Sequence, residues 1–101
     1  MGIDIRSENG AAIAVLSGEI DHHSAKKMRS ELDRFIITMQ PELMAMDFGS
    51  ITFMDSSGIG LIMGRSKLLK ECGGRLEIHN PQPYIRRVIK LSGLERIVKI
   101  R

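Results

Sequence analysis

The stretch Phe53-Met54-Asp55-Ser56-Ser57-Gly58-Ile59-Gly60 lies near the middle of the chain, and within it an apolar strand pattern ends and a helical pattern begins. Two adjacent hydroxyl groups, those of Ser56 and Ser57, lie at this junction. The first turn of a helix offers unpaired backbone N–H groups and the positive end of the helix dipole, so a serine there caps the helix or holds a phosphate. Both serines are therefore candidates for a switch.

Strand and helix patterns alternate on both sides of this junction. Asn9-Gly10 predicts a hairpin turn, and Asp21 is the predicted N-cap of the first helix, which Pro41 closes. The expected strands are 3–6, 12–16, 43–48 with a loop at 49–50 before 51–54, 75–79 and 97–100, and the expected helices run to Met39, from about Ser57 to Glu71, and from Pro83 to Leu91. The order β-β-α-β-α-β-α-β predicts an α/β fold with a mostly parallel mixed sheet and helices packed on it.

Three local patterns carry further expectations. Consecutive apolar residues over 12–16 predict a strand buried on both faces that ends near Ser17-Gly18. Gly60 and Gly64, one helical turn apart, predict close approach of that helix to the sheet. Arg65 falls within the apolar arc of the same helix, and helical phase alone leaves open whether it meets a carboxylate such as Asp47 or reaches solvent.

The composition narrows the class of protein. A chain of 101 residues with 43% hydrophobic residues is long enough for one core. The net charge of +3 is spread over several elements, and the aromatic residues are not interleaved with basic ones, so nucleic-acid binding is not indicated. We find neither a signal-peptide pattern nor an apolar stretch of membrane-spanning length, and Cys72 has no cysteine partner, so we expect a cytoplasmic protein with no membrane partner.

A second polar stretch, Ser17-Gly18-Glu19-Ile20-Asp21-His22-His23-Ser24, also follows a predicted strand. Loops after parallel strands collect along one edge of a sheet, so this stretch is expected beside Ser56 and Ser57. The charged face of the helix that follows, including Lys26, Arg29 and Asp33, is interpreted as a solvated surface with modest ion pairs.

Three chemistries compete at this edge. A hydrolase would use Ser56 or Ser57 with His22 or His23, but the G-x-S-x-G elbow is missing. A metal site would use Asp21, His22 and His23, with or without His79, but adjacent residues on a first helical turn point in different directions. A phosphoacceptor role for Ser56 is tolerated by the helix dipole, and the plainer interpretation is that Ser56 is only the N-cap.

The polar loop Gly18–Ser24, the stretch Phe53–Gly60 and the later Ser92-Gly93-Leu94 together resemble the STAS-domain anti-sigma factor antagonists, in particular the sporulation subgroup. The resemblance covers essentially the whole chain. It implies one STAS domain over residues 1–101, although the further helix that members often carry after the last strand has no counterpart before Arg101.

The resemblance also implies a mechanism. The unphosphorylated protein would bind an anti-sigma factor that is a serine kinase with its own bound ATP, and so release the sigma factor. Phosphorylation of Ser56 would end that binding, and a serine phosphatase would restore it. The chain itself would be no enzyme and would hold no cofactor or metal.

The partner-binding residues implied by the resemblance lie around Ser56, and they are Asp21, His22, His23, Asp55, Ser57, Gly58 and Ile59. The alternative functions are a general-stress or stressosome-type regulator or scaffold and a small serine hydrolase.

Overall fold

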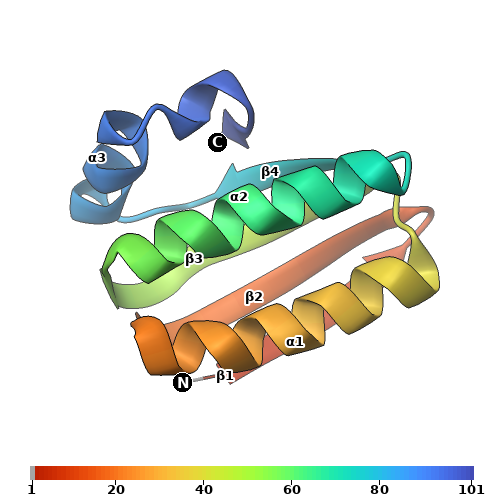
Figure 1. The fold of residues 1–101 in the computed structure, drawn as a ribbon, viewed down its shortest axis with the longest axis horizontal. Coiled ribbons are helices and arrows are strands. Elements are labelled where there is room, and N and C mark those ends of the chain that lie inside the picture. The colour runs from red at the N-terminus through yellow and green to blue at the C-terminus, as the bar shows by residue number, and fades with distance from the viewer. Residues whose placement is uncertain (1) are drawn as a thin grey trace.

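The computed structural model describes residues 2–101 as a five-stranded sheet with two long helices side by side on one face (Figure 1). The elements are β1 (Gly2–Glu8), β2 (Ala11–Ile20), α1 (His22–Met39), β3 (Leu43–Met54), α2 (Ser56–Glu71), β4 (Arg75–His79), α3 (Pro83–Leu91), the 3₁₀ turn η1 (Leu94–Arg96) and β5 (Lys99–Ile100). This order confirms the predicted α/β arrangement. No helix among residues 2–101 is both long and apolar enough to cross a membrane.

The sheet places the ends of two neighbouring strands together. Its order is β1-β2-β3-β4-β5, with β1 antiparallel to β2 and every later pair parallel. The turn between β1 and β2 uses Asn9 and Gly10 with φ of 53° and 82°, as the predicted hairpin requires. Ile20 pairs with Met54 at the ends of β2 and β3, so the chain enters α1 and α2 from adjacent points.

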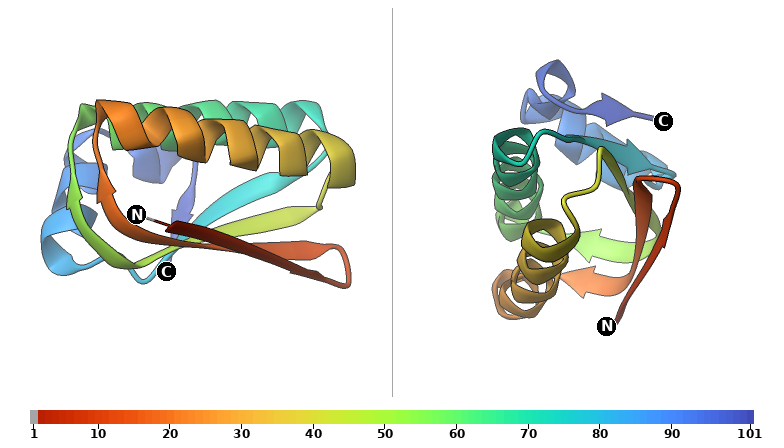
Figure 2. Two further views of the ribbon diagram at one scale, coloured as in Figure 1. Left: turned by 90° about the horizontal axis from the view of Figure 1, so that it is seen from below. Right: turned by 90° about the vertical axis from the view of Figure 1, so that its right-hand side faces the viewer.

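The core lies between the sheet and the helix pair α1 and α2 (Figure 2). Each helix turns an apolar stripe towards the strands, as its spacing predicts. The largest fully buried side chains come from both layers and include Leu16, Ile20, Met28, Leu32, Ile36, Met46, Phe48, Ile62 and Leu69. Burying one such side chain contributes about 1.5–3 kcal/mol, so this layer holds the helix starts firmly over the strand ends.

The strands β2 and β3 are longer than predicted. β2 continues through Ser17-Gly18 to Ile20, and β3 runs unbroken through Gly49-Ser50. These residues are poor strand formers, but Ser17 pairs with Ser50 and Gly18 with Ile51, so each strand gives the other its hydrogen bonds. Register shifts on both sides of this pairing absorb the bend, and Figure 2 shows both strands curving towards the helix starts.

The prediction that β2 is buried on both faces was wrong. Ala12, Ala14 and Leu16 are buried towards the helices, whereas Ile13 on the opposite face is 47% exposed. The cause is that α1 and α2 cover the same face of the sheet (Figure 2).

The prediction for the helix glycines was also wrong in position. A Cβ atom at Gly60 or Gly64 would meet nothing within 4 Å. The close approach is at Gly58 instead, where a Cβ would overlap the side chain of buried Met54. Hence the close approach of α2 to the sheet is at the strand-to-helix junction and not in the middle of the helix.

The C-terminal strand is shorter than predicted. Gly93, with φ of 81°, ends the helical segment and leads into η1, so the extended backbone begins only at Lys99. Leu94 and Val98 bury their side chains in the core from this turn.

Candidate functional site

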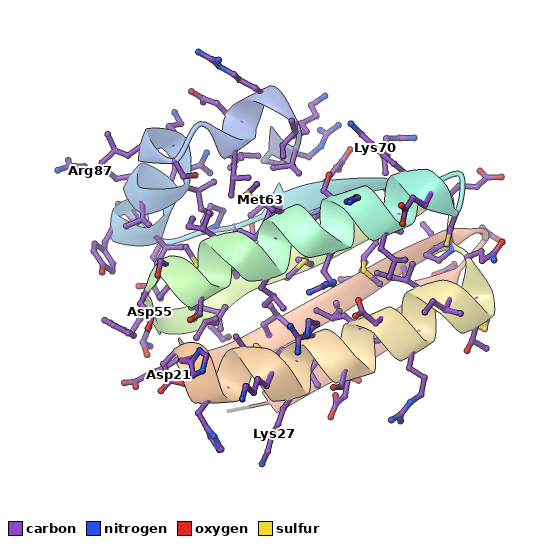
Figure 3. The ribbon with its side chains drawn as sticks, in the orientation of Figure 1. Asp21, Lys27, Asp55, Met63, Lys70 and Arg87 are labelled. Carbon is purple, nitrogen blue, oxygen red and sulfur yellow. The ribbon has the colours of Figure 1, made fainter. Side chains whose placement is uncertain are left out.

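The two polar stretches meet at one edge of the sheet, as predicted. The backbone N–H of Asp55 donates to the carbonyl of Ile20 at 3.1 Å, which joins the residue before α2 to the end of β2. Figure 3 shows Asp21 and Asp55 at the neighbouring ends of α1 and α2. The N-termini of the two helices therefore form one surface.

The start of α1 is closed by a reciprocal capping box. The Asp21 carboxylate accepts the backbone N–H of Ser24 at 2.8 Å, and the Ser24 hydroxyl oxygen accepts the backbone N–H of Asp21 at 3.0 Å. The same hydroxyl donates to the carbonyl of Glu19 at 2.8 Å. The Ser24 backbone N–H and hydroxyl, both hydrogen-bonded to the carboxylate, hold the pKa of Asp21 below its usual value.

The start of α2 has the same kind of cap but a different first turn. Asp55 is the N-cap, and its carboxylate accepts the backbone N–H of Ser57 at 2.8 Å. Ser56 is the first helical residue, one position earlier than predicted, and it is exposed. Among residues 2–101 its hydroxyl has no hydrogen-bond partner. The interpretation of Ser56 as the N-cap is therefore wrong, because Asp55 caps the helix and leaves the serine hydroxyl free.

The remaining residues expected at the partner surface differ in exposure. His22 and His23 are exposed on the first turn of α1. Ser57 and Ile59 are half-buried, and Gly58 is buried beneath them. The outward groups at this edge are thus two imidazoles and the Ser56 hydroxyl, while Gly58 shapes the backbone under them.

The positions of these side chains also bear on the hydrolase and the metal site considered for them. In the described chain, no hydrogen bond joins a serine hydroxyl to a histidine ring. His79 lies on β4 with its Nε2 3.0 Å from Oε1 of Glu77 and does not join His22 and His23. Over residues 2–101 we find no group of three or more His, Cys, Asp or Glu side chains arranged to hold a metal ion.

A basic groove of about 260 Å³ runs between α1 and α2, directly behind the helix starts. It is lined by His22, Ala25, Lys26, Arg29, Ser57, Gly60, Leu61 and Arg65. The sequence analysis did not predict this groove, because it forms only when two separate helices lie side by side. We call these residues the basic groove.

Arg65 lies at the floor of the basic groove and is 6% exposed. Its Nε lies 2.7 Å from Oδ1 of Asp33 in an ion pair, and its Nη1 donates to the carbonyl of Leu61 at 3.3 Å. Burial lowers the pKa of Arg65, Asp33 raises it, and the nearby charge of Arg29 lowers it again. The carboxylate that meets Arg65 is therefore that of Asp33 and not that of Asp47. The interpretation of Asp33 as part of a solvated face was wrong.

Comparison with known proteins gives a consistent result. Residues 2–101 match the family model for the STAS domain. An anti-sigma F factor antagonist of Paenibacillus polymyxa is 37% identical over 98 residues, which cover 97% of this chain and 84% of that protein. An anti-sigma-B factor antagonist of Bacillus subtilis (strain 168) is 27% identical over 100 residues, covering 99% of this chain and 90% of that protein.

Two solved structures are also similar. The anti-sigma factor antagonist SpoIIAA in its unphosphorylated form has a TM-score of 0.85 and 30% identity, covering 99% of this chain and 88% of that one. The Bacillus cell fate determinant SpoIIAA in the phosphorylated form has a TM-score of 0.76 and 30% identity, covering 99% and 91%.

Proposed function

The chain belongs to the STAS domain family, and we propose that it is an anti-sigma factor antagonist of the sporulation type, switched by phosphorylation of Ser56. In its unphosphorylated form it binds an anti-sigma factor and so releases the sigma factor. The observation that carries the proposal is the exposed, unengaged hydroxyl of Ser56 on the first turn of α2, at the surface shared with the start of α1.

The position of Ser56 suits a phosphoacceptor. Its hydroxyl is free to attack the γ-phosphoryl group of ATP bound by the anti-sigma factor, which acts as the serine kinase, while Asp55 maintains the helix cap. A phosphoserine adds about −1.5 to −2 charges, and the positive end of the helix dipole tolerates them. The fold therefore survives the modification, and a serine phosphatase returns the protein to its binding form.

The same charge disrupts the complex with the partner. Asp21 and Asp55 already bring two carboxylates to the helix starts, so a phosphate at Ser56 makes this surface strongly acidic. We assign the contacts with the anti-sigma factor to the outward His22 and His23, with Asp21, Asp55, Ser57, Gly58 and Ile59 shaping the surface around Ser56.

The test is site-mapping mass spectrometry after incubation with the anti-sigma factor and ATP. The wild-type chain is expected to gain one phosphate on Ser56, and Ser56→Ala is expected to gain none while still binding. Ser57→Ala is the matched control, because it removes the neighbouring hydroxyl and leaves the backbone N–H that Asp55 caps. Phosphate on Ser57 in the wild type, or tight binding by Ser56→Asp, would contradict the switch.

A general-stress regulator is the second candidate, favoured by the similarity to the Bacillus subtilis anti-sigma-B factor antagonist over nearly the whole chain. The two candidates differ in the partner and share the fold. Binding measured against the sporulation-type and stress-type anti-sigma factors of one bacterium separates them, because only the true partner also phosphorylates the chain.

A further inference from the structure

The basic groove carries positive charge that the described chain does not balance. Lys26, Arg29 and Arg65 all line it, and Asp33 forms an ion pair with Arg65. Over residues 2–101, neither Lys26 nor Arg29 has a carboxylate oxygen within 4.0 Å. At His22 and Ser57 the groove reaches the first turns of two helices that begin at the same end, so both dipoles add positive potential there (Figure 1).

The buried Arg65 forms the positive floor of the groove. The guanidinium is more than nine-tenths buried, its Nε is ion-paired with Oδ1 of Asp33 at 2.7 Å, and its Nη1 donates to the carbonyl of Leu61. A buried charge is stable only when it is paired and hydrogen-bonded. Asp33 offsets one positive charge, and Arg29 adds another beside it.

The groove is continuous with the surface proposed to bind the partner. His22 and Ser57 line the groove and also belong to that surface. A partner that covers Ser56 therefore reaches the mouth of the groove. Together, the surface and the groove have an acidic part at Asp21 and Asp55 and a basic part at Lys26 and Arg29. This arrangement favours a partner that places basic side chains against the acidic part and acidic side chains against the basic part.

From this arrangement we propose that the basic groove binds an acidic side chain, an aspartate or glutamate, of the docked anti-sigma factor. The inference rests on the proposed function and adds the chemistry of the contact. The carboxylate lies between the Arg29 guanidinium and the Lys26 ammonium, above Arg65. The contact fixes how the partner sits across α1 and α2, and hence how Ser56 is presented to the kinase.

Isothermal titration calorimetry of the unphosphorylated full chain with its anti-sigma factor tests the inference. Arg29→Glu reverses an exposed charge in the groove, and Lys27→Glu makes the same change on the same helix, where Figure 3 shows the side chain pointing away from α2. We expect Arg29→Glu to raise Kd by about tenfold or more and Lys27→Glu to change it by less than about twofold. Arg29→Gln is expected to fall between them, and added salt is expected to narrow the difference.

The outcomes separate the groove from the proposed function. If the wild type binds and the Arg29 and Lys27 variants lose affinity equally, or neither loses any, the groove inference is overturned and the function stands. If the wild type itself does not bind, both fail. A titration with inorganic phosphate is the last test. If phosphate shifts the amide NMR signal of Gly60 to saturation in the wild type but not in Arg29→Gln, the groove is a free-anion site and the inference is overturned.

Discussion

The two helix starts at this edge begin with the same residue and end their first turns differently. Asp21 caps α1 in the sequence Asp21-His22-His23-Ser24, and Asp55 caps α2 in the sequence Asp55-Ser56-Ser57-Gly58. In α1 the fourth residue is a serine whose hydroxyl accepts the N–H of Asp21. In α2 it is a glycine with no side chain, and the N–H of Asp55 donates to Ile20 of the neighbouring strand instead.

This difference gives the α1 start a closed set of hydrogen bonds and leaves the α2 start suited to the switch proposed for Ser56. The capping box uses every polar group of Ser24 inside α1 and ties the helix to Glu19. The glycine of α2 lets the backbone pack on Met54, and Asp55 alone caps the turn, so Ser56 is left with a free hydroxyl. Neither cap needs the next two side chains, and these are His22 and His23 in α1 but Ser56 and Ser57 in α2, so the α2 start is the one that places hydroxyl groups there.

The largest expected effect comes from filling the space at the second start. Gly58→Ala places a methyl group against Met54, which is buried and has no solvent to move into. Because the overlap with Met54 is deep, the cost is expected at the upper end of the range for overpacking, about 3 kcal/mol, which outweighs the gain in helix propensity of roughly 1 kcal/mol. Urea unfolding is expected to show a net loss of stability.

Gly64→Ala is the matched control for this change, since it lies in the same helix and its new methyl group meets nothing within 4 Å. It should raise the free energy of unfolding by about 0.5–1 kcal/mol. Equal gains for Gly58→Ala and Gly64→Ala would mean that Met54 yields freely and that close packing is not what requires glycine at the junction.

Removing the two caps compares the starts directly. Asp21→Ala breaks one half of a reciprocal box and should cost about 1–2 kcal/mol, whereas Asp55→Ala removes a single hydrogen bond and should cost about 0.5–1 kcal/mol. Urea unfolding at neutral pH measures both values. A double-mutant cycle of Asp21→Ala with Ser24→Ala is expected to be non-additive, because the two side chains form one unit. Additive losses, or a larger loss at Asp55, would contradict the difference between the starts.

What the sequence predicted about these starts follows from local chemistry. Asp21 was predicted as a cap, and the meeting of the two polar stretches was predicted from the rule that parallel strands end at one edge. Gly58 was missed as the point of close approach because its contact, Met54, belongs to the preceding strand and depends on the angle of the turn.

The basic groove was missed for the same kind of reason. Lys26 and Arg29 look solvated on α1 alone, and only the neighbouring α2 turns their side of the helix into a groove. Arg65 in an apolar arc was the one signal in the sequence, and it left open whether this side chain meets a carboxylate or reaches solvent. The choice of Asp33 over Asp47 depends on how α1 and α2 pack, and the Asp47 carboxylate on β3 instead accepts hydrogen bonds from the Asn80 side chain and the Gly49 backbone N–H.

The smallest expected effect is the pH dependence that the Asp21 cap of α1 gives to the free energy of unfolding. Because Ser24 donates to the Asp21 carboxylate, the folded pKa of Asp21 is below its unfolded value of about 3.9. A lowered folded pKa contributes stability that is fully present above the unfolded pKa and is lost as the pH falls through the folded pKa. Asp21→Asn keeps a capping oxygen without a titrating group, so its free energy of unfolding should fall less steeply than the wild type's below about pH 4.

Glu77, whose pKa is lowered mainly by its hydrogen bond to His79 and further by Arg101, contributes stability that is lost in the same direction of pH. Glu77→Gln therefore serves as the background in which the Asp21 difference must persist; parallel curves for Asp21→Asn and its parent there would mean that the capping box does not favour the ionised carboxylate.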